Sequence, residues 1–401
     1  MELLSRPCPI CNSNKNVGVF SQKFDNLIEL NNAGDVYIQK IVICKDCGFV
    51  FNNPCPSYAE LDKHYTSWSN YETPQTEGKA TKEMDNKWQR TFDFVKKSFP
   101  EKFKGKALEV GCATAFGLSV FKSNGWEVLG LDPSEKAVNL AKKLYGIEVI
   151  KALFDINLFK GKKFDLIIFS HVLEHIISPS ELVNELIPIL EPNGLVFIEV
   201  PNMLRPEVPM GYFTFEHLNY FTPGALTNLM GVSGYDLNRV ELFGGSMEIQ
   251  PFYPVISALY GPRKSGSAFK LKNDFEASNE AVQNYIKNSD QAADQINKKI
   301  DAVLKKYSSG KIALWAAGIH TSQLLSLTKL SDKNIALIFD NDPKKQGQDL
   351  CNVKVTGLDP ENVKNKVDCI IISSRAFEKE IYEQIKFLET YGIEIVKIYS
   401  N

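Results

Sequence analysis

Four of the eight cysteines form two Cys-x-x-Cys pairs near the start of the 401-residue chain. Cys8 and Cys11 make the first pair, and Cys44 and Cys47 make the second. Two such turns can direct four thiolates at one tetrahedral ion, and four protein ligands leave no open position for water. The spacing therefore predicts a structural Zn2+ site, with two redox pairs or two disulfides as the alternatives.

A second pattern, LEVGCATAFG, combines an acidic residue with small ones. An apolar strand is predicted to end at Glu109. Small residues follow at alternate positions, among them Gly111 and Ala113, and Gly117 opens a helix. Small side chains let the backbone approach a ligand. The next predicted strand ends at Asp132, whose carboxylate can accept hydrogen bonds from two ribose hydroxyls. We therefore expect a nucleoside at these strand ends.

Loops that bind dinucleotides share this arrangement. Glu109 distinguishes a dinucleotide ligand from a nucleoside without phosphate. A carboxylate would repel a pyrophosphate, whereas a nucleoside with a positive sulfonium centre carries no phosphate. The loop resembles the E-x-G-x-G-x-G motif of class I S-adenosylmethionine (SAM)-dependent methyltransferases, with Ala113 and Ala115 standing where glycine is usual. Because alanine adds one methyl group, we expect a tighter loop that still binds. A degenerate loop without a ligand is the alternative.

Candidate acid–base residues follow the predicted strands. His171 and His175 lie in FDLIIFSHVLEHI, and His217 follows Glu216 in the aromatic-rich GYFTFEHLNYFTP. Histidine titrates near neutrality and can take a proton from carbon or oxygen. His217 and His175 are the catalytic candidates, while His171 is grouped with the cofactor residues. The alternative for His217 is a hydrogen bond to a backbone carbonyl that anchors the segment, and the alternative for His171 is a cap on the strand end. Asp155 is a candidate for the adenine amine, or else an exposed loop acid.

Alternating strands and helices position these residues. KALEVG, WEVLGLD, FDLIIFS and GLVFIEV are predicted strands, and KWQRTFDFVKKSF, FGLSVFKSNG, SEKAVNLAKKLYG and SPSELVNELIPIL are predicted helices. Repeated units of this kind give an α/β fold, with a parallel sheet covered by helices on both faces.

Composition shifts divide the chain into four segments. Residues 1–65 are turn-rich, with two strands that carry the cysteine pairs. Residues 66–255 hold the central α/β domain and begin with a polar linker or lid. Residues 256–308 are polar and helical, a linker, and 309–401 repeat the α/β alternation as a smaller, doubly wound domain.

The overall charge and hydropathy exclude some partners. Lys+Arg 46 against Asp+Glu 48 gives a net charge of −2, without the basic excess of a nucleic-acid binder. No apolar run approaches the ~20 residues that span a bilayer. The first residues lack the apolar core of a signal peptide, so a cytoplasmic location is expected.

The order of parts resembles the sugar-nucleotide C-methyltransferases. These join a zinc ribbon-like domain, a Rossmann-like class I methyltransferase domain and a smaller C-terminal Rossmann-like domain. The resemblance covers almost the whole chain. It is carried by the four paired cysteines, EVGCATAFG, LEHI, FEH, FGGS, LWAAGIHTSQLL and FDNDPKKQG.

The resemblance implies a nucleotide-linked 4-keto-6-deoxysugar as substrate and partner. His217 would remove the C3 proton, and the enolate would attack the methyl group of SAM. His175 and Glu216 would stabilise or position the sugar, because positioned donors can hold the enolate oxygen. The C-terminal domain would close over the nucleotide half of the substrate, without a cofactor of its own. The implied contacts there are Gly318, His320 and Asp340.

Two departures from the family pattern weaken the C-methylation prediction. Thr214 stands where the family usually has a tyrosine, two positions before Glu216. Tyr71 is the nearest candidate for another family tyrosine, which precedes the methyltransferase domain and is grouped with the catalytic residues. An O- or N-methyltransferase acting on another small molecule remains an alternative. A zinc-ribbon scaffold with an inert methyltransferase domain is a further one.

Overall fold

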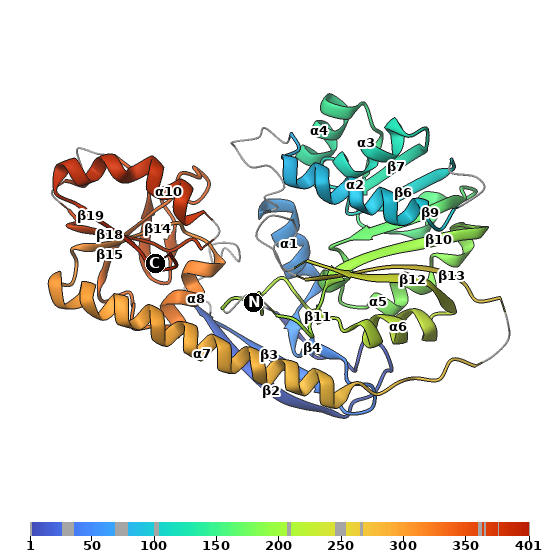
Figure 1. Ribbon diagram of the computed structural model, residues 1–401, viewed down its shortest axis with the longest axis horizontal. Helices are drawn as coiled ribbons and strands as arrows, with labels where there is room; N and C mark the ends of the chain where they lie inside the picture. Colours follow the sequence, from blue (N-terminus) through green and yellow to red (C-terminus); the bar gives the residue numbers. More distant parts are fainter. Residues whose placement is uncertain are drawn as a thin grey trace.

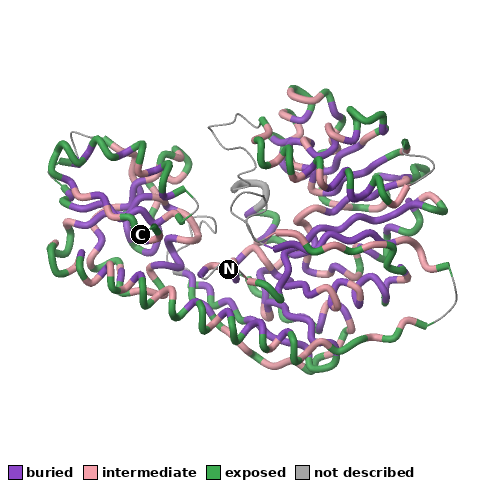
Figure 2. The backbone as a smooth tube through the Cα atoms, in the orientation of Figure 1, coloured by how far each residue is buried: buried purple, intermediate pink, exposed green. Residues whose placement is uncertain are grey.

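The computed structural model describes residues 2–25, 36–68, 79–99, 104–206, 210–244, 254–264, 268–359, 363–364, 366–375 and 377–400. Figure 1 shows one α/β unit at each end of the molecule, and helix α7 (Phe275–Lys306) running along one side between them. Figure 2 shows that the strands of both units are buried, while the helices around them expose one face. The alternation of strands and helices therefore builds two separate α/β sheets.

The larger sheet has seven strands, in the spatial order β12-β13-β10-β9-β6-β7-β8. The five strands from β10 to β8 are parallel, and β13 and β12 are antiparallel to their neighbours. The bounds in chain order are β6 (Lys106–Val110), β7 (Glu127–Asp132), β8 (Val149–Lys151), β9 (Phe164–Ser170), β10 (Leu190–Pro201), β12 (Tyr235–Phe243) and β13 (Val255–Pro262). The predicted strand ends at Glu109 and Asp132 are confirmed within one residue, so both carboxylates lie at the carboxyl edge of the sheet.

Helices connect these strands as the apolar periodicity predicts. They are α2 (Lys82–Lys96), α3 (Phe116–Ser123), α4 (Glu135–Tyr145), α5 (Pro179–Asn184) and α6 (Pro223–Val232), with the 3-10 helices η2 (Ile156–Phe159), η3 (Leu173–His175) and η4 (Ile187–Ile189). Ser134 caps α4 by accepting a hydrogen bond from the Ala137 amide, as expected. The helix predicted over SPSELVNELIPIL is shorter, because Pro188 cannot supply an amide to a continuing helix.

The seventh strand corrects one expected domain boundary. β13 pairs with β10 from Val255 to Tyr260, inside the segment 256–308 that we expected to be a helical linker. The helix of that segment is α7, which begins only at Phe275. The central domain therefore extends to Pro262. The apolar run VISALY of β13 was the sequence signal for this strand.

The N-terminal sheet has four strands, in the order β11-β4-β3-β2. Their bounds are β2 (Asn16–Asp25), β3 (Val36–Cys44), β4 (Val50–Asn52) and β11 (Asn219–Tyr220), and a separate pair is formed by β1 (Leu3–Leu4) and β5 (Cys55–Pro56). β11 follows Glu216 and His217 closely in the chain, and it pairs with β4. The central domain therefore completes the N-terminal sheet, which fixes the segment that carries both residues. Helix α1 (Tyr58–Trp68) then leads toward the central domain.

The C-terminal sheet has six strands, in the order β16-β17-β15-β14-β18-β19. Its elements are β14 (Ile312–Trp315), α8 (Ile319–Leu327), β15 (Ile335–Phe339), β16 (Asp349–Leu350), β17 (Val353–Thr356), β18 (Cys369–Ile372), α10 (Glu378–Ile385), η5 (Lys386–Tyr391) and β19 (Glu394–Lys397). The alternation of strands and helices that we expected over residues 309–401 is present in these elements. Among the helices that the structure describes, none has the length and apolar character to cross a lipid bilayer.

Candidate active site

A cavity of about 300 Å3 opens at the carboxyl ends of β6, β7 and β9. Helix α2 covers one side of it with Met84, Lys87 and Trp88, so the end of the expected linker or lid segment does reach the site. The cavity wall contains most of the predicted cofactor residues, together with one catalytic candidate: Glu109, Gly111, Ala113, Gly117, Asp132, His171 and His175. Carboxyl ends of parallel strands are where doubly wound sheets bind ligands.

The loop after β6 has an unusual backbone. Gly111, Ala113 and Ala115 adopt φ angles of 71°, 47° and 57°, all in the left-handed region. A residue with a Cβ atom costs about 1–2 kcal/mol in this region. Glycine is therefore favoured at these positions by backbone conformation. The two alanines make the loop strained as well as tight, which the sequence alone did not indicate.

Two glycines of the loop are required by close packing. A Cβ atom on Gly117 would lie 2.4 Å from the ring of Trp88, and one on Gly111 would lie 2.7 Å from Cγ2 of Val172. Non-bonded carbon atoms do not approach each other this closely. Helix α2 and the segment after β9 can approach the loop only because both side chains are absent.

Asp132 ties the loop to the second strand. Its Oδ2 accepts a hydrogen bond from the Ala113 amide at 2.8 Å, and its Oδ1 accepts one from the Ser134 amide at 2.9 Å. The side chain is 2% exposed, and burial raises its pKa. Each carboxylate oxygen has a second lone pair, so the geometry leaves Asp132 able to accept from ribose hydroxyls as well.

Glu109 is a buried carboxyl group that faces the cavity. It is 2% exposed, and its Oε2 has no hydrogen-bond partner among the residues that the structure describes. Burial raises the pKa of Glu109 to about 8, opposed by the positive charge of Lys87. A buried carboxyl group with an oxygen that lacks a hydrogen-bond partner favours a cationic ligand and disfavours a phosphate.

A charged network that sequence reasoning missed lies beside the cavity. Glu199 is fully buried on β10, and Lys87 and Arg90 of α2 contact its two oxygens at 3.2 and 2.6 Å. His171 bridges this carboxylate to Glu174, with Nδ1 lying 3.2 Å from Glu174 Oε1. Burial and Lys87 lower the pKa of His171, but the hydrogen bonds to Glu174 and Glu199 prevail and raise it.

The network gives His171 a structural position as well as a place in the cavity wall. It adopts φ 58°, and its amide donates to the Glu199 carbonyl at 2.9 Å. The helical periodicity of α2 could have suggested that Lys87 and Arg90 share one face of the helix. Their common partner Glu199 could not be found in this way, because it lies more than a hundred residues further along the chain.

The two catalytic candidates contact each other, and His175 is the one that lies in the cavity wall. The rings of His175 and His217 pack edge to face, with centroids 4.9 Å apart. Nδ1 of His175 lies 3.1 Å from the carbonyl oxygen of Glu216, so this nitrogen donates and the Nε2 atom can accept. Burial and the neighbouring His175 lower the pKa of His217 to about 4, which keeps its imidazole neutral at pH 7.

Glu216 completes this group and has a partner that the sequence did not reveal. His64 of α1 places Nε2 3.0 Å from Glu216 Oε1. Burial raises the pKa of Glu216, but the hydrogen bond to His64 and the nearby histidines lower it to about 2. Glu216 is therefore a carboxylate at every physiological pH.

Two predicted residues lie elsewhere. Asp155 is exposed and caps η2, accepting a hydrogen bond from the Asn157 amide at 2.9 Å. The neighbouring Leu153 and Phe154 line the cavity, whereas Asp155 is not in its wall. Its role with adenine stays a prediction. Tyr71 lies outside the described residues.

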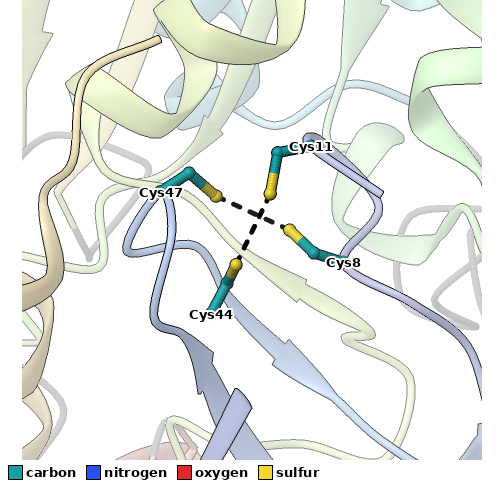
Figure 3. Close-up of side chains that lie close together, drawn as sticks. All are labelled: Cys8, Cys11, Cys44 and Cys47. Atoms are coloured by element: carbon teal, nitrogen blue, oxygen red, sulfur yellow. Dashed lines mark hydrogen bonds between the residues drawn. The ribbon is translucent and has the colours of Figure 1, made fainter. Parts of the chain in front are cut away.

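The four paired cysteines come together as predicted (Figure 3). The sulfur atoms of Cys8 and Cys47 lie 3.6 Å apart, too far for the ~2.05 Å of a disulfide. Those of Cys11 and Cys44 lie 3.5 Å apart. All four lie within 4.8 Å of one another, and a tetrahedral ion with ~2.3 Å bonds to sulfur would space them about 3.8 Å apart. The cluster could hold such an ion.

Gly48 anchors this cluster to α7. It has φ 77°, and a Cβ atom there would lie 2.4 Å from the backbone of Asp274 and Phe275. The Asp274 amide donates to the Cys47 carbonyl at 3.2 Å. The second cysteine turn therefore packs directly against the start of the long helix.

Comparison with known families gives two matches along the chain. A family described as a methyltransferase domain matches residues 80–240, which include α2, the loop after β6 and the histidine group. A family described as C2185-like, N-terminal, matches residues 308–398, the C-terminal α/β unit.

Among curated proteins, the chain is similar to the C-methyltransferase NovU of Streptomyces niveus. The two are 25% identical over 306 residues, which cover 73% of this chain and 71% of NovU. A ubiquinone biosynthesis O-methyltransferase of Roseobacter denitrificans is 24% identical over 155 residues, covering 34% of this chain and 62% of the relative.

Solved structures of methyltransferases also resemble the chain. One is magnesium protoporphyrin IX methyltransferase (ChlM) from Synechocystis PCC 6803 with bound SAH, which has 18% identity and a TM-score of 0.38. The match covers 52% of this chain and 100% of that one. The family match, the similarity to NovU and the residues around the cavity agree with one another. The chain is therefore a SAM-dependent methyltransferase.

Proposed function

We propose that the protein methylates a carbon atom of a nucleotide-linked keto-deoxysugar, and that four cysteines hold a structural Zn2+ ion. One observation carries the proposal: His217 is neutral and packs against His175, which lies in the cavity wall and contacts the carbonyl oxygen of Glu216. The name of NovU, a C-methyltransferase similar over most of both chains, supports it.

The cavity suits SAM through the chemistry of its donors. The unpartnered oxygen of Glu109 can face a cationic cofactor, whose positive charge favours the ionised form of this carboxyl group, and Asp132 offers acceptors to ribose hydroxyls. When bound, SAM supplies an electrophilic methyl group whose bond to sulfur breaks with both electrons going to sulfur. The acceptor must therefore supply an electron pair and lose a proton.

His217 is suited to removing that proton. A ketone acidifies the neighbouring C–H bond, and a neutral imidazole can take this proton while the electron pair stays on the sugar as an enolate. His175, with Nδ1 fixed by the Glu216 carbonyl, can orient the sugar through Nε2. Glu216 stays charged and can accept hydrogen bonds from sugar hydroxyls.

Hydrogen exchange in heavy water tests the carbon-acid mechanism. The protein is incubated with SAH and nucleoside-diphosphate-linked 4-keto-6-deoxyglucoses carrying different bases, and deuterium at C3 is measured by mass spectrometry. We expect exchange with the wild type and a loss of at least about 100-fold with His217→Ala, as for removal of a general base. Glu127→Ala, which changes an exposed residue at the opposite end of β7, is the control. Absence of wild-type exchange, with methyl transfer to a hydroxyl or amine instead, would favour an O- or N-methyltransferase.

Metal analysis tests the zinc site. We expect one zinc per chain in the purified protein, and loss of zinc with a large loss of stability in Cys44→Ser, because metal binding and folding are coupled. Cys351→Ser changes a buried cysteine outside the cluster and should retain the metal. Equal zinc content in both variants would remove the basis for this site.

A further inference from the structure

His64 contacts Glu216 across 152 residues of sequence. It lies on α1, which belongs to the N-terminal part of the chain, and its side chain is almost fully buried. Its Nε2 is 3.0 Å from Glu216 Oε1. A carboxylate can only accept, so Nε2 must carry a proton and donate it.

The position of His64 is fixed by packing. Its ring meets that of Phe215 edge to face, with centroids 4.8 Å apart and planes at 88°. Phe215 is fully buried with Phe24 and Tyr37 of the N-terminal sheet. A buried ring held in this way can direct its Nε2–H group at one point without losing much conformational entropy.

Glu216 is held at two points by two histidines. Its carbonyl accepts from Nδ1 of His175, and its Oε1 accepts from His64. The side chain of Glu216 is nevertheless 32% exposed, against 4% for His64. One oxygen of the carboxylate is therefore engaged inside the protein, while the side chain as a whole stays partly exposed.

We propose that His64 is a positioning residue for the sugar-binding carboxylate of Glu216. It engages one oxygen and so directs the carboxylate toward a hydroxyl of the acceptor. This inference rests on the proposed function, because it assigns Glu216 to the acceptor sugar. It also gives the N-terminal domain a part in the site: α1 supplies the donor that holds a residue of the central domain.

Three variants separate positioning from packing. His64→Phe keeps the ring and removes the donor. His64→Gln places an amide nitrogen near the position of Nε2 and can still donate. Leu61→Ala is the matched control, because Leu61 is 6% exposed on the same helix and packs with Cys55, Ile177 and Leu218.

The acceptor KM and the pH profile of kcat/KM are measured with the sugar nucleotide on which the wild type is active. His64→Phe is expected to raise the KM at least tenfold. Because Glu216 loses the hydrogen bond from His64 that lowers its pKa, this pKa should rise, and kcat/KM should fall toward acidic pH. His64→Gln should restore both properties toward wild type, and SAH affinity should stay unchanged throughout.

The proposal is overturned if His64→Phe keeps the wild-type KM and pH profile. It is also overturned if Leu61→Ala shows the same fall of kcat/KM at low pH as His64→Phe. If His64→Phe does not fold, His64→Asn replaces it, since its amide cannot reach the position of Nε2. A wild type that methylates no keto sugar would instead contradict the proposed function, so the two failures are distinguishable.

Discussion

Two strand–loop–helix units of this molecule are built alike, one after β6 and the other after β14. In the first, Asp132 accepts hydrogen bonds from the amides of Ala113 and Ser134 at 2.8 and 2.9 Å. In the second, Asp340 accepts from the amides of Ala317 and Asp342 at 2.7 and 2.8 Å. The aspartate at the end of the second strand therefore ties the loop to the sheet in both units.

The two units differ in the first strand. β6 carries the buried acid Glu109 next to its last residue, whereas the residues of β14 are IALW, all apolar and buried. Lys345 also lies 3.7 Å from the Asp340 carboxylate, whereas among the residues that the structure describes no lysine or arginine forms an ion pair with Asp132. Both units therefore use an aspartate to hold the loop, so its presence alone does not indicate a cofactor site. The buried acid and the cavity beside it distinguish the SAM site.

The largest expected effect is on cofactor affinity. Asp132→Asn should weaken SAH binding about 100-fold, because charged acceptors of the ribose hydroxyls are lost, whereas Asp340→Asn should leave it unchanged. Asp132→Asn should also lose about 1–3 kcal/mol of stability, because a buried charged acceptor is lost, and Asp340→Asn should lose less, because Asp340 is only partly buried. Calorimetry and denaturant unfolding measure the two quantities. Equal SAH affinity in Asp132→Asn and wild type would contradict the assignment of the cofactor site to the unit after β6.

The pH dependence of SAM binding tests the role of Glu109. Its pKa of about 8 means that the group is protonated below this pH in the cofactor-free protein. Binding of a cation favours the ionised form, so affinity should fall by up to about tenfold per pH unit below pH 8. Glu109→Gln should bind more weakly at pH 8 and lose this slope. Titrations of both proteins with SAM between pH 6 and 9 measure this pH dependence. The same slope in wild type and Glu109→Gln would mean that another group causes it.

The smallest expected effect concerns the strained alanines. Ala113→Gly and Ala115→Gly relieve a cost of about 1–2 kcal/mol but add entropy to the unfolded chain, so a net stabilisation of about 0.5–1 kcal/mol is expected. Ala316, with φ 97° in the loop after β14, should respond similarly when changed to glycine. Denaturant midpoints measure these changes. Destabilisation of all three variants would mean that the left-handed backbone carries little strain.

Much of the site could be predicted because its signals are local. The strand that ends near Glu109, the helix that starts near Gly117 and the acid at Asp132 follow from apolar periodicity and small residues over about 25 positions. The two cysteine pairs likewise follow from spacing. These patterns fix which residues reach the carboxyl edge of a sheet, since strand ends of a parallel sheet share one edge.

Tertiary structure alone decided the contacts between distant segments. His64 meets Glu216, Arg90 meets Glu199, and β11 joins the N-terminal sheet, although each pair lies more than a hundred residues apart. No local pattern encodes such pairs, because they depend on how separately formed elements pack. The sequence by itself determined the two α/β units, the cofactor loop and the cysteine cluster. Packing decided which buried charges pair, since a buried charge needs a partner and only the folded chain brings one within reach.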